Sequence, residues 1–372
     1  IAQIAAGMGI TTKILELFNM HFISLYTMNA RSYYVKTYVL FLENFTHNCL
    51  VLNESILFDD NHFKFLHLIN YNQVPIIQIV RDPFKRMATV INHVDNMYYN
   101  GMKPDIINNK ECLQQMFDSL VYPNFIYSDN DLLIVSPPTR MPNVLSSGWF
   151  IKYFTCDMFL KYFNINKCIF VDLEELNYFN LKQTVCSLAK ILSKTVDKKY
   201  LDRLTFENLN DKELFWYFPL KIKIDKDIQI LLERKVYSYN KYSMLDITDK
   251  VLDVNSYFKE KIVVTIHDSI SLNDTKYQLI KSKLSIYLDT FLKLVKNEIK
   301  NNYKKPLEII EYMRHNKFIR YKIKNKINSE ICFLKQHRPD IVASWKYYQE
   351  FEKMCEELDE KEDSLKENIS NN

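Results

Sequence analysis

Short apolar runs alternate with amphipathic stretches along the first 197 residues of the chain. Runs of strand length lie at the start of the chain and at residues 49–58, 74–80 and 166–176. Between them, apolar residues recur at three- and four-residue spacing, which predicts helices at 10–18, from Pro83, at 146–163 and at 181–194. Strands that alternate with helices predict a parallel sheet with helices on both faces, so the expected fold class is α/β.

After residue 197 the pattern becomes rich in lysine and asparagine, and it predicts a mainly helical extension, residues 198–360, with a few strands such as 259–270. The final helix repeats apolar residues at three-four spacing, at Tyr348, Phe351, Cys355 and Leu358. We expect this stripe to pack on the body of the protein. The alternative is a short coiled-coil contact, through which the chain would form an oligomer. The acidic tail, 361–372, is predicted to be disordered.

Charge and cysteine content narrow the function classes. The 49 Lys and Arg residues exceed the 45 Asp and Glu residues by only four, so a nucleic-acid-binding surface is not expected and any anion site must be local. The seven cysteines contain no C-x-x-C pair, which favours a reducing, cytoplasmic setting without a zinc or disulfide framework. No apolar run reaches the ~20 residues needed to span a bilayer. The chain begins with Ile1, so its first residue is not expected to be the native start.

The stretch IIQIVRDPFKRMATVINH, residues 76–93, carries a basic cluster at the end of a predicted strand. Asp82 is a typical N-cap residue and Pro83 a typical first helical residue, so a helix is expected to begin there. Arg81 then lies at the carboxyl end of the strand, beside the start of this helix. In an open parallel sheet, ligands bind at that edge.

One face of the predicted helix is polar, because Arg86, Thr89 and His93 are spaced by three and four residues. A guanidinium at the strand end and a hydroxyl along the helix can together hold a phosphate group. The alternative interpretation is an ordinary strand-to-helix turn with solvated basic residues, in which Arg86 lies on the helix surface.

The stretch AAGMGITTK, residues 5–13, holds two of the four glycines in the chain. The backbone at Gly7 and Gly9 can fold around an anion, with the hydroxyls of Thr11 and Thr12 beside it at the helix N-terminus. The stretch lacks the Gly-Lys-Ser/Thr of a Walker A loop and the third glycine of a dinucleotide fingerprint. A plain turn or helix cap is the alternative.

Together these two stretches resemble the P-loop sulfotransferases, through an uncharacterised bacterial branch with a C-terminal helical extension. In that family a Gly-Thr-rich first loop and an Arg-x-Pro-x-x-Arg-x-x-Ser motif bind 3'-phosphoadenylyl sulfate. Here RDPFKRMAT supplies Arg81, Pro83 and Arg86, with Thr89 in place of the serine. The similarity extends over about residues 1–194. It implies a sulfotransferase-like nucleotide-binding domain over 1–197 that requires no metal.

The resemblance assigns roles to the candidate residues. The donor nucleotide would be held by Gly7, Gly9, Thr11, Thr12, Arg81 and Thr89. Lys13 would assist at the 5' end of the donor. The base that deprotonates the acceptor hydroxyl would be Glu54 or, as second choice, His62, and each has the alternative of an ordinary surface role. The acids Asp172, Glu174 and Glu175 would orient an acceptor sugar, unless they form a solvated strand end.

Three hypotheses for function follow. The first is a sulfotransferase that acts on a carbohydrate or similar hydroxyl acceptor. The second is a catalytically inactive nucleotide-binding or interaction protein on the same fold, because Ala6 and Met8 stand where many family members carry a lysine. The third is a P-loop kinase, suggested by the glycine pair with Thr12 and Lys13.

Overall fold

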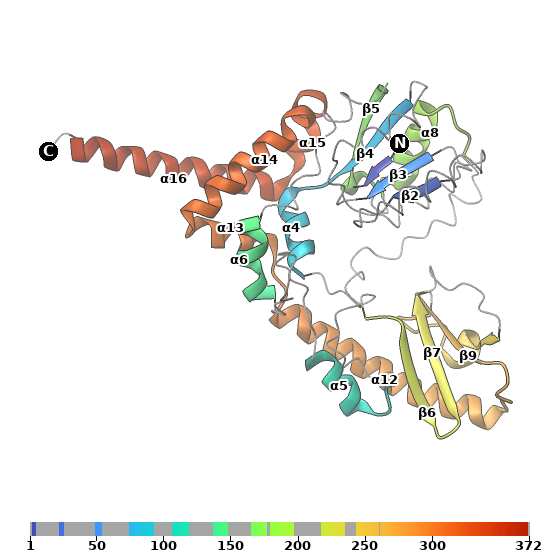
Figure 1. The fold of residues 1–372 in the computed structure, drawn as a ribbon. Helices are drawn as coiled ribbons and strands as arrows, with labels where there is room; N and C mark the ends of the chain where they lie inside the picture. The colour runs from blue at the N-terminus through green and yellow to red at the C-terminus, as the bar shows by residue number, and fades with distance from the viewer. Residues whose placement is uncertain are drawn as a thin grey trace. The chain divides into compact units, whose positions relative to one another are not determined.

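The computed structural model describes the chain at residues 2–4, 22–25, 49–53, 74–92, 106–118, 137–147, 165–176, 179–196, 217–234, 243–259 and 261–370. The chain forms two compact units, each assembled from segments that are distant in sequence (Figure 1). The first unit comprises Ile1–Val90, Val144–Phe206 and Lys305–Asn372, and the second comprises Ile91–Asn143 and Glu207–Lys304. The predicted division after residue 197 differs from this grouping, because the C-terminal segment belongs with the N-terminal strands.

The first unit contains a five-stranded sheet in which neighbouring strands pair in parallel. In sheet order the strands are β2 (Phe22–Leu25), β3 (Cys49–Asn53), β1 (Ala2–Ile4), β4 (Val74–Val80) and β5 (Ile165–Asp172). The strands predicted from the apolar runs are therefore confirmed, as is the mixed α/β character. Strand β2 was not predicted, because a run of four residues does not stand out in a chain this rich in apolar residues.

The strands β4 and β5 present alternate residues to the two faces of the sheet. The face toward α8 (Leu181–Ile191) is formed by Ile77, Ile79, Ile169 and Val171. On the other face, the ring of Phe170 lies 5.9 Å from the ring of Phe333 in α14 (Lys317–His337). Helices thus cover both faces of this strand pair, as the alternating pattern predicted.

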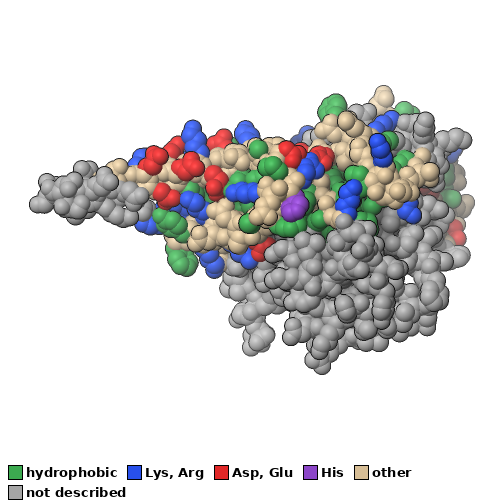
Figure 2. All heavy atoms as spheres, turned by 90° about the horizontal axis from the view of Figure 1, so that it is seen from above, with side chains coloured by type: hydrophobic (Ala, Val, Ile, Leu, Met, Phe, Trp, Pro, Cys, Tyr) green, Lys and Arg blue, Asp and Glu red, His purple; other side chains and the backbone are tan. Residues whose placement is uncertain are grey.

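The C-terminal helices are part of the first unit. They are α13 (Pro306–Arg314), α14, α15 (Pro339–Ser344) and α16 (Lys346–Ser370). The apolar stripe of α16 is buried at Tyr348, Phe351, Met354 and Cys355. The stripe packs within the chain, as predicted, while acidic and basic side chains gather on the exposed surface of the C-terminal helices (Figure 2). The helix continues to Ser370, so most of the tail that was predicted to be disordered is helical.

The second unit is built on a four-stranded antiparallel sheet (Figure 1). Its strands, in sheet order, are β6 (Leu220–Asp225), β7 (Ile228–Arg234), β9 (Ile262–His267) and β8 (Met244–Asp246). One face packs against α12 (Asp274–Asn301), which buries Ile280, Leu284, Leu288 and Phe291. A mainly helical extension with a few strands was expected after residue 197, and this prediction understates the sheet.

The remaining helices are shorter. They are α4 (Pro83–Asn92), α5 (Lys110–Asp118), α6 (Pro137–Ser147) and α11 (Thr248–Val251). Helices α5 and α11 belong to the second unit, while α4 and α6 each cross from a segment of one unit into a segment of the other. The helix expected at 146–163 lies outside the described residues except at its first two positions.

The described cysteines include one exception to the expected absence of disulfides. Cys168 in β5 is disulfide-bonded. The cysteines at 112, 186, 332 and 355 carry free thiols. The prediction of a chain without a disulfide framework is therefore corrected at one strand of the parallel sheet.

Within the described residues, no helix combines the length and the apolar character needed to cross a membrane. The longest is α12, with 28 residues, and lysines recur along it. Its buried side chains contact the antiparallel sheet.

Candidate functional site

The order of the parallel strands places the carboxyl ends of β1 and β4 next to each other. Strand β1 pairs with β4, with Ile4 opposite Ile79. From β1 the chain continues to β2 on one side of this pair, and from β4 it continues to β5 on the other side. Such a reversal of direction creates a crevice at the carboxyl ends of the two central strands, where open α/β sheets bind ligands. Here those ends are followed by AAGMGITTK and by Arg81.

The segment after β4 begins a helix as its sequence predicts. The carboxylate Oδ1 of Asp82 accepts a hydrogen bond from the backbone N–H of Phe84 at 2.9 Å. The backbone carbonyl of Asp82 accepts another from the N–H of Arg86 at 3.1 Å. Pro83 occupies the first helical position, where no N–H is needed. This cap fixes the direction in which α4 leaves the sheet.

The side chains of Arg81 and Thr89 are in contact. The guanidinium Nη1 of Arg81 donates to the hydroxyl Oγ1 of Thr89 at 2.9 Å, and the same hydroxyl donates to the carbonyl of Lys85 at 3.0 Å. Thr89 is exposed and Arg81 is half-buried. The structure thus joins the two residues that were predicted to hold a phosphate.

Burial leaves the guanidinium of Arg81 poorly solvated. Desolvation lowers its pKa, Glu174 acts in the opposite direction, and the neighbouring Arg86 lowers the pKa further. Its Nε is buried and has no hydrogen-bond partner among the described residues. Arg86 itself is only 4% exposed, so the alternative in which it lies on the helix surface is wrong. Two cationic groups therefore lie close together at this corner.

The acids that follow β5 are engaged rather than solvated. Glu174, in the short 3₁₀ helix η3 (Leu173–Leu176), forms an ion pair with Lys85 at 2.6 Å. Glu175 pairs with Arg338 at 2.7 Å, and Asp172 is only 3% exposed. The prediction of a solvated strand end is therefore corrected at Asp172, whereas Glu174 is paired but keeps an exposed side chain. These acids lie beside α4 and the C-terminal helices.

Asp82 and Asp172 make matching contacts at the ends of adjacent strands. One oxygen of each carboxylate caps the turn that follows its own strand: Asp82 accepts from Phe84, and Asp172 accepts from the N–H of Glu174 at 2.9 Å. The other oxygen binds the segment 345–347, which comprises the residue before α16 and the first two residues of that helix. Asp82 accepts from the backbone N–H of Tyr347 at 3.0 Å, and Asp172 from the indole Nε1 of Trp345 at 2.5 Å. This segment therefore holds both strand ends.

Both carboxyl groups have a raised pKa. For Asp172 burial raises the pKa to about 6, and the negative charges of Glu174 and Glu175 act in the same direction. Hydrogen bonds from Glu174 and Trp345 lower the pKa, but they do not offset the desolvation. Burial also raises the pKa of Asp82, against the hydrogen bonds from Phe84 and Tyr347.

Arg338 strengthens the same junction. Its guanidinium donates to the carbonyl of Phe170 at 2.9 Å, to Glu175 at 2.7 Å and to Asp340 at 2.8 Å. The hydrogen bond to Asp340, and after it the bond to Glu175, raise the pKa of Arg338 against the effect of burial. Sequence analysis did not find Arg338, Trp345 or Tyr347, because each contacts a residue more than 160 positions away.

The other predicted site residues cannot be placed. Gly7, Gly9, Thr11, Thr12, Lys13, Glu54 and His62 lie outside the described residues, as does His93. Within the described part of the chain, no group of three or more His, Cys, Asp or Glu side chains is arranged to hold a metal ion.

Comparison with known proteins gives a family but no activity. A search of the curated proteins found no match. A search of the solved structures found none either. The model of the family described as "Protein of unknown function (DUF2972)" matches residues 170–358, just over half of the chain. The match begins in β5 and ends in α16, so it includes the acids of β5 and the segment that binds them, but not Arg81. The chain therefore belongs to the DUF2972 family.

Proposed function

We propose that the first unit binds 3'-phosphoadenylyl sulfate, and that the chain transfers the sulfuryl group to a hydroxyl of a carbohydrate or similar acceptor. The observation that carries the proposal is the contact of Arg81 with Thr89 at the carboxyl end of β4. It lies where the strand order predicts a ligand crevice. A parallel sheet of the P-loop sulfotransferase type is part of this proposal.

The chemistry of this corner suits a phosphate. A partly desolvated guanidinium gains more from an adjacent anion than a solvated one does, because the local dielectric is low. Within the part of the chain that the structure describes, the Nε of Arg81 is a free hydrogen-bond donor. The hydroxyl of Thr89 lies against Nη1 of the same guanidinium. A phosphate bound here would accept from the guanidinium of Arg81, and from the hydroxyl of Thr89 once its proton turns away from the carbonyl of Lys85. Among the neighbouring acids, Glu174 has the largest opposing effect on Arg81, and it is already paired with Lys85.

Sulfuryl transfer also needs a base for the acceptor hydroxyl and positive groups near the departing phosphate. In our proposal Glu54 or His62 is the base, and Lys13 supports the 5' end of the donor together with the glycine-threonine loop. Gly7, Gly9, Thr11 and Thr12 supply that loop.

The test is a calorimetric titration of the full chain with adenosine 3',5'-bisphosphate. We expect Arg81→Ala to weaken binding by about 10- to 150-fold, since a hydrogen bond to a charged group contributes about 1.5–3 kcal/mol. Thr89→Val should weaken binding less, because it removes a neutral donor. Lys190→Ala, an exposed change on α8 of the same unit, is the matched control and should bind as the wild type does.

The outcomes separate the competing hypotheses. Absence of binding by the wild type, or equal binding by Arg81→Ala, contradicts the proposal. Binding without consumption of the sulfate donor in the presence of a glycan extract favours the catalytically inactive nucleotide-binding protein. Magnesium-dependent hydrolysis of ATP, with no binding of the bisphosphate, favours the P-loop kinase.

A further inference from the structure

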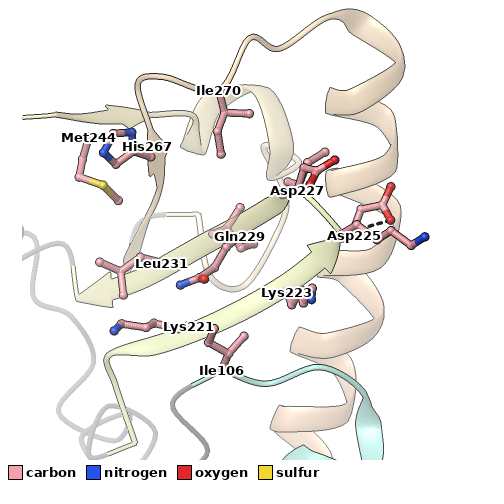
Figure 3. A pocket seen from close by; sticks show the side chains of 13 residues that line it. Ile106, Lys221, Lys223, Asp225, Asp227, Gln229, Leu231, Met244, His267 and Ile270 are labelled. Atoms are coloured by element: carbon pink, nitrogen blue, oxygen red, sulfur yellow. Dashed lines mark hydrogen bonds between the residues drawn. The ribbon is translucent and has the colours of Figure 1, made fainter.

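The antiparallel sheet of the second unit carries a pocket on the face opposite to its core (Figure 3). Along β6 the residues alternate, with Leu220, Ile222 and Ile224 buried and the intervening side chains exposed. The exposed set includes Lys221 and Lys223, which line the pocket. Its volume is about 520 Å³. This is within the range of small-molecule sites.

One end of the pocket is cationic. Lys221 and Lys223 project from the same face of β6, about 6.6 Å apart along the strand. Among the described residues, neither ammonium group is paired with a carboxylate. His267 lies across the pocket, and its Nδ1 is engaged by the hydroxyl of Ser269 at 2.7 Å. Its Nε2 is therefore the nitrogen that can face a ligand.

The other end of the pocket is acidic. Asp225 ends β6, Asp227 lies in the turn to β7 beside Lys226, and Gln229 follows in β7 (Figure 3). Two carboxylates against one ammonium group leave this end with a net negative charge. Asp225 accepts a hydrogen bond from the backbone N–H of Lys226 at 2.8 Å. Carboxylates accept hydrogen bonds from hydroxyl groups but repel anions, so the two ends select different parts of a ligand.

The walls between the two ends are partly apolar. They are formed by Ile106, Leu231, Met244 and Ile270. The pairing register sets this arrangement, because Lys221 lies opposite Leu231 and Lys223 lies opposite Gln229. Each cation therefore has a neutral neighbour across the strand pair rather than an acid.

We propose that this pocket binds a phosphorylated monosaccharide. Two ammonium groups and an imidazole suit a phosphate, which carries more charge than a carboxylate. Gln229 and the carboxylates of Asp225 and Asp227 accept hydrogen bonds from the sugar hydroxyls. The volume accommodates one sugar ring with its phosphate. This site belongs to the second unit alone and does not depend on the function proposed for the first.

Met244 allows binding to be located. The full chain is labelled with methyl-¹³C methionine, and the Met244 signal is assigned from its loss in Met244→Leu. Glucose 6-phosphate is then titrated, with glucose and inorganic phosphate as separate probes. We expect a saturable shift of the Met244 signal with glucose 6-phosphate, weaker binding of inorganic phosphate, and no shift with glucose.

Two double variants test whether the lysine charges of the pocket bind the phosphate group. We expect the double variant Lys221→Gln, Lys223→Gln to bind glucose 6-phosphate at least about tenfold more weakly. The double variant Lys250→Gln, Lys296→Gln removes the same charge from exposed positions on α11 and α12 and should bind normally. Asp227→Asn should weaken the binding of glucose 6-phosphate but not the binding of inorganic phosphate.

Three results would overturn the proposal. They are the absence of a saturable shift, an equal loss of binding in the two double variants, and equal affinities for inorganic phosphate and glucose 6-phosphate. The last would reduce the pocket to a simple anion site. Circular dichroism melting of each variant separates a loss of binding from a loss of folding.

Discussion

Replacing Phe351 with alanine is expected to lower the free energy of unfolding of the first unit by about 3–5 kcal/mol, the range for removing a buried aromatic side chain. Phe351 of α16 is fully buried, and its ring centroid lies 4.8 Å from that of Phe84. Phe84 is the second residue of α4. The cavity would therefore open beside the helix that carries Thr89.

The measurement is urea unfolding followed by tryptophan fluorescence. In a Trp149→Phe, Trp216→Phe background, Trp345 is the only tryptophan left of the three in the chain, and it belongs to the first unit. Lys353→Ala, an exposed change on the same helix, is the control and should stay within about 0.5 kcal/mol. A loss below about 1 kcal/mol for Phe351→Ala would show that α16 does not stabilise this corner.

This expectation changes the meaning of the C-terminal region. From the sequence it looked like an extension appended to a complete nucleotide-binding domain. In the structure Asp82, Asp172 and Phe84 all contact α16 or the residue before it. The corner that carries Arg81 is thus held by residues more than 250 positions away. The proposed donor site and the C-terminal helices form one structural unit.

Local pattern was sufficient for every strand of the parallel sheet except β2. The apolar runs at β3, β4 and β5 are bounded by polar residues, and their period distinguishes them from the amphipathic helices. The start of α4 was also predictable, because Asp82 and Pro83 determine it through their own side chains. The contact of Arg81 with Thr89 follows from these two elements alone.

In the antiparallel sheet the strand β9 was predicted, but the hairpin of β6 and β7 was missed although its signal was present. The stretch LKIKIDKDIQILLER alternates apolar and polar residues on both sides of a short turn, which is typical of a hairpin. The surrounding lysines and asparagines favoured helix. In contrast, no local signal could have predicted the bonds of Trp345 and Tyr347, because a hydrogen bond between distant segments depends on the completed fold.

The second large effect expected concerns Asp172 and pH. Its pKa in the folded protein, raised to about 6 by burial, exceeds its ordinary value of 3.8. Between these values the folded state binds more protons than the unfolded state, so stability falls as pH rises. The contribution of Asp172 to stability is therefore greatest below pH 3.8 and is lost as pH rises through about 6. The loss is about 3 kcal/mol.

Asp172→Asn isolates this contribution. The amide accepts only one of the two hydrogen bonds, which lowers the stability by about 1 kcal/mol at every pH, but it never ionises. The free energy of unfolding of the variant relative to the wild type should therefore increase by about 2 kcal/mol between pH 4 and pH 7. Urea unfolding followed through Trp345 at each pH measures this difference.

Asp340→Asn provides a control of opposite sign. The hydrogen bond from Arg338 lowers the pKa of Asp340, so its ionised form is favoured on folding. Its contribution to stability is present above its ordinary pKa and is lost at lower pH. The stability of Asp340→Asn relative to the wild type should therefore fall as pH rises through the acidic range. A difference for Asp172→Asn that does not vary with pH would mean that Asp172 is not desolvated, and that the junction with α16 is open to water.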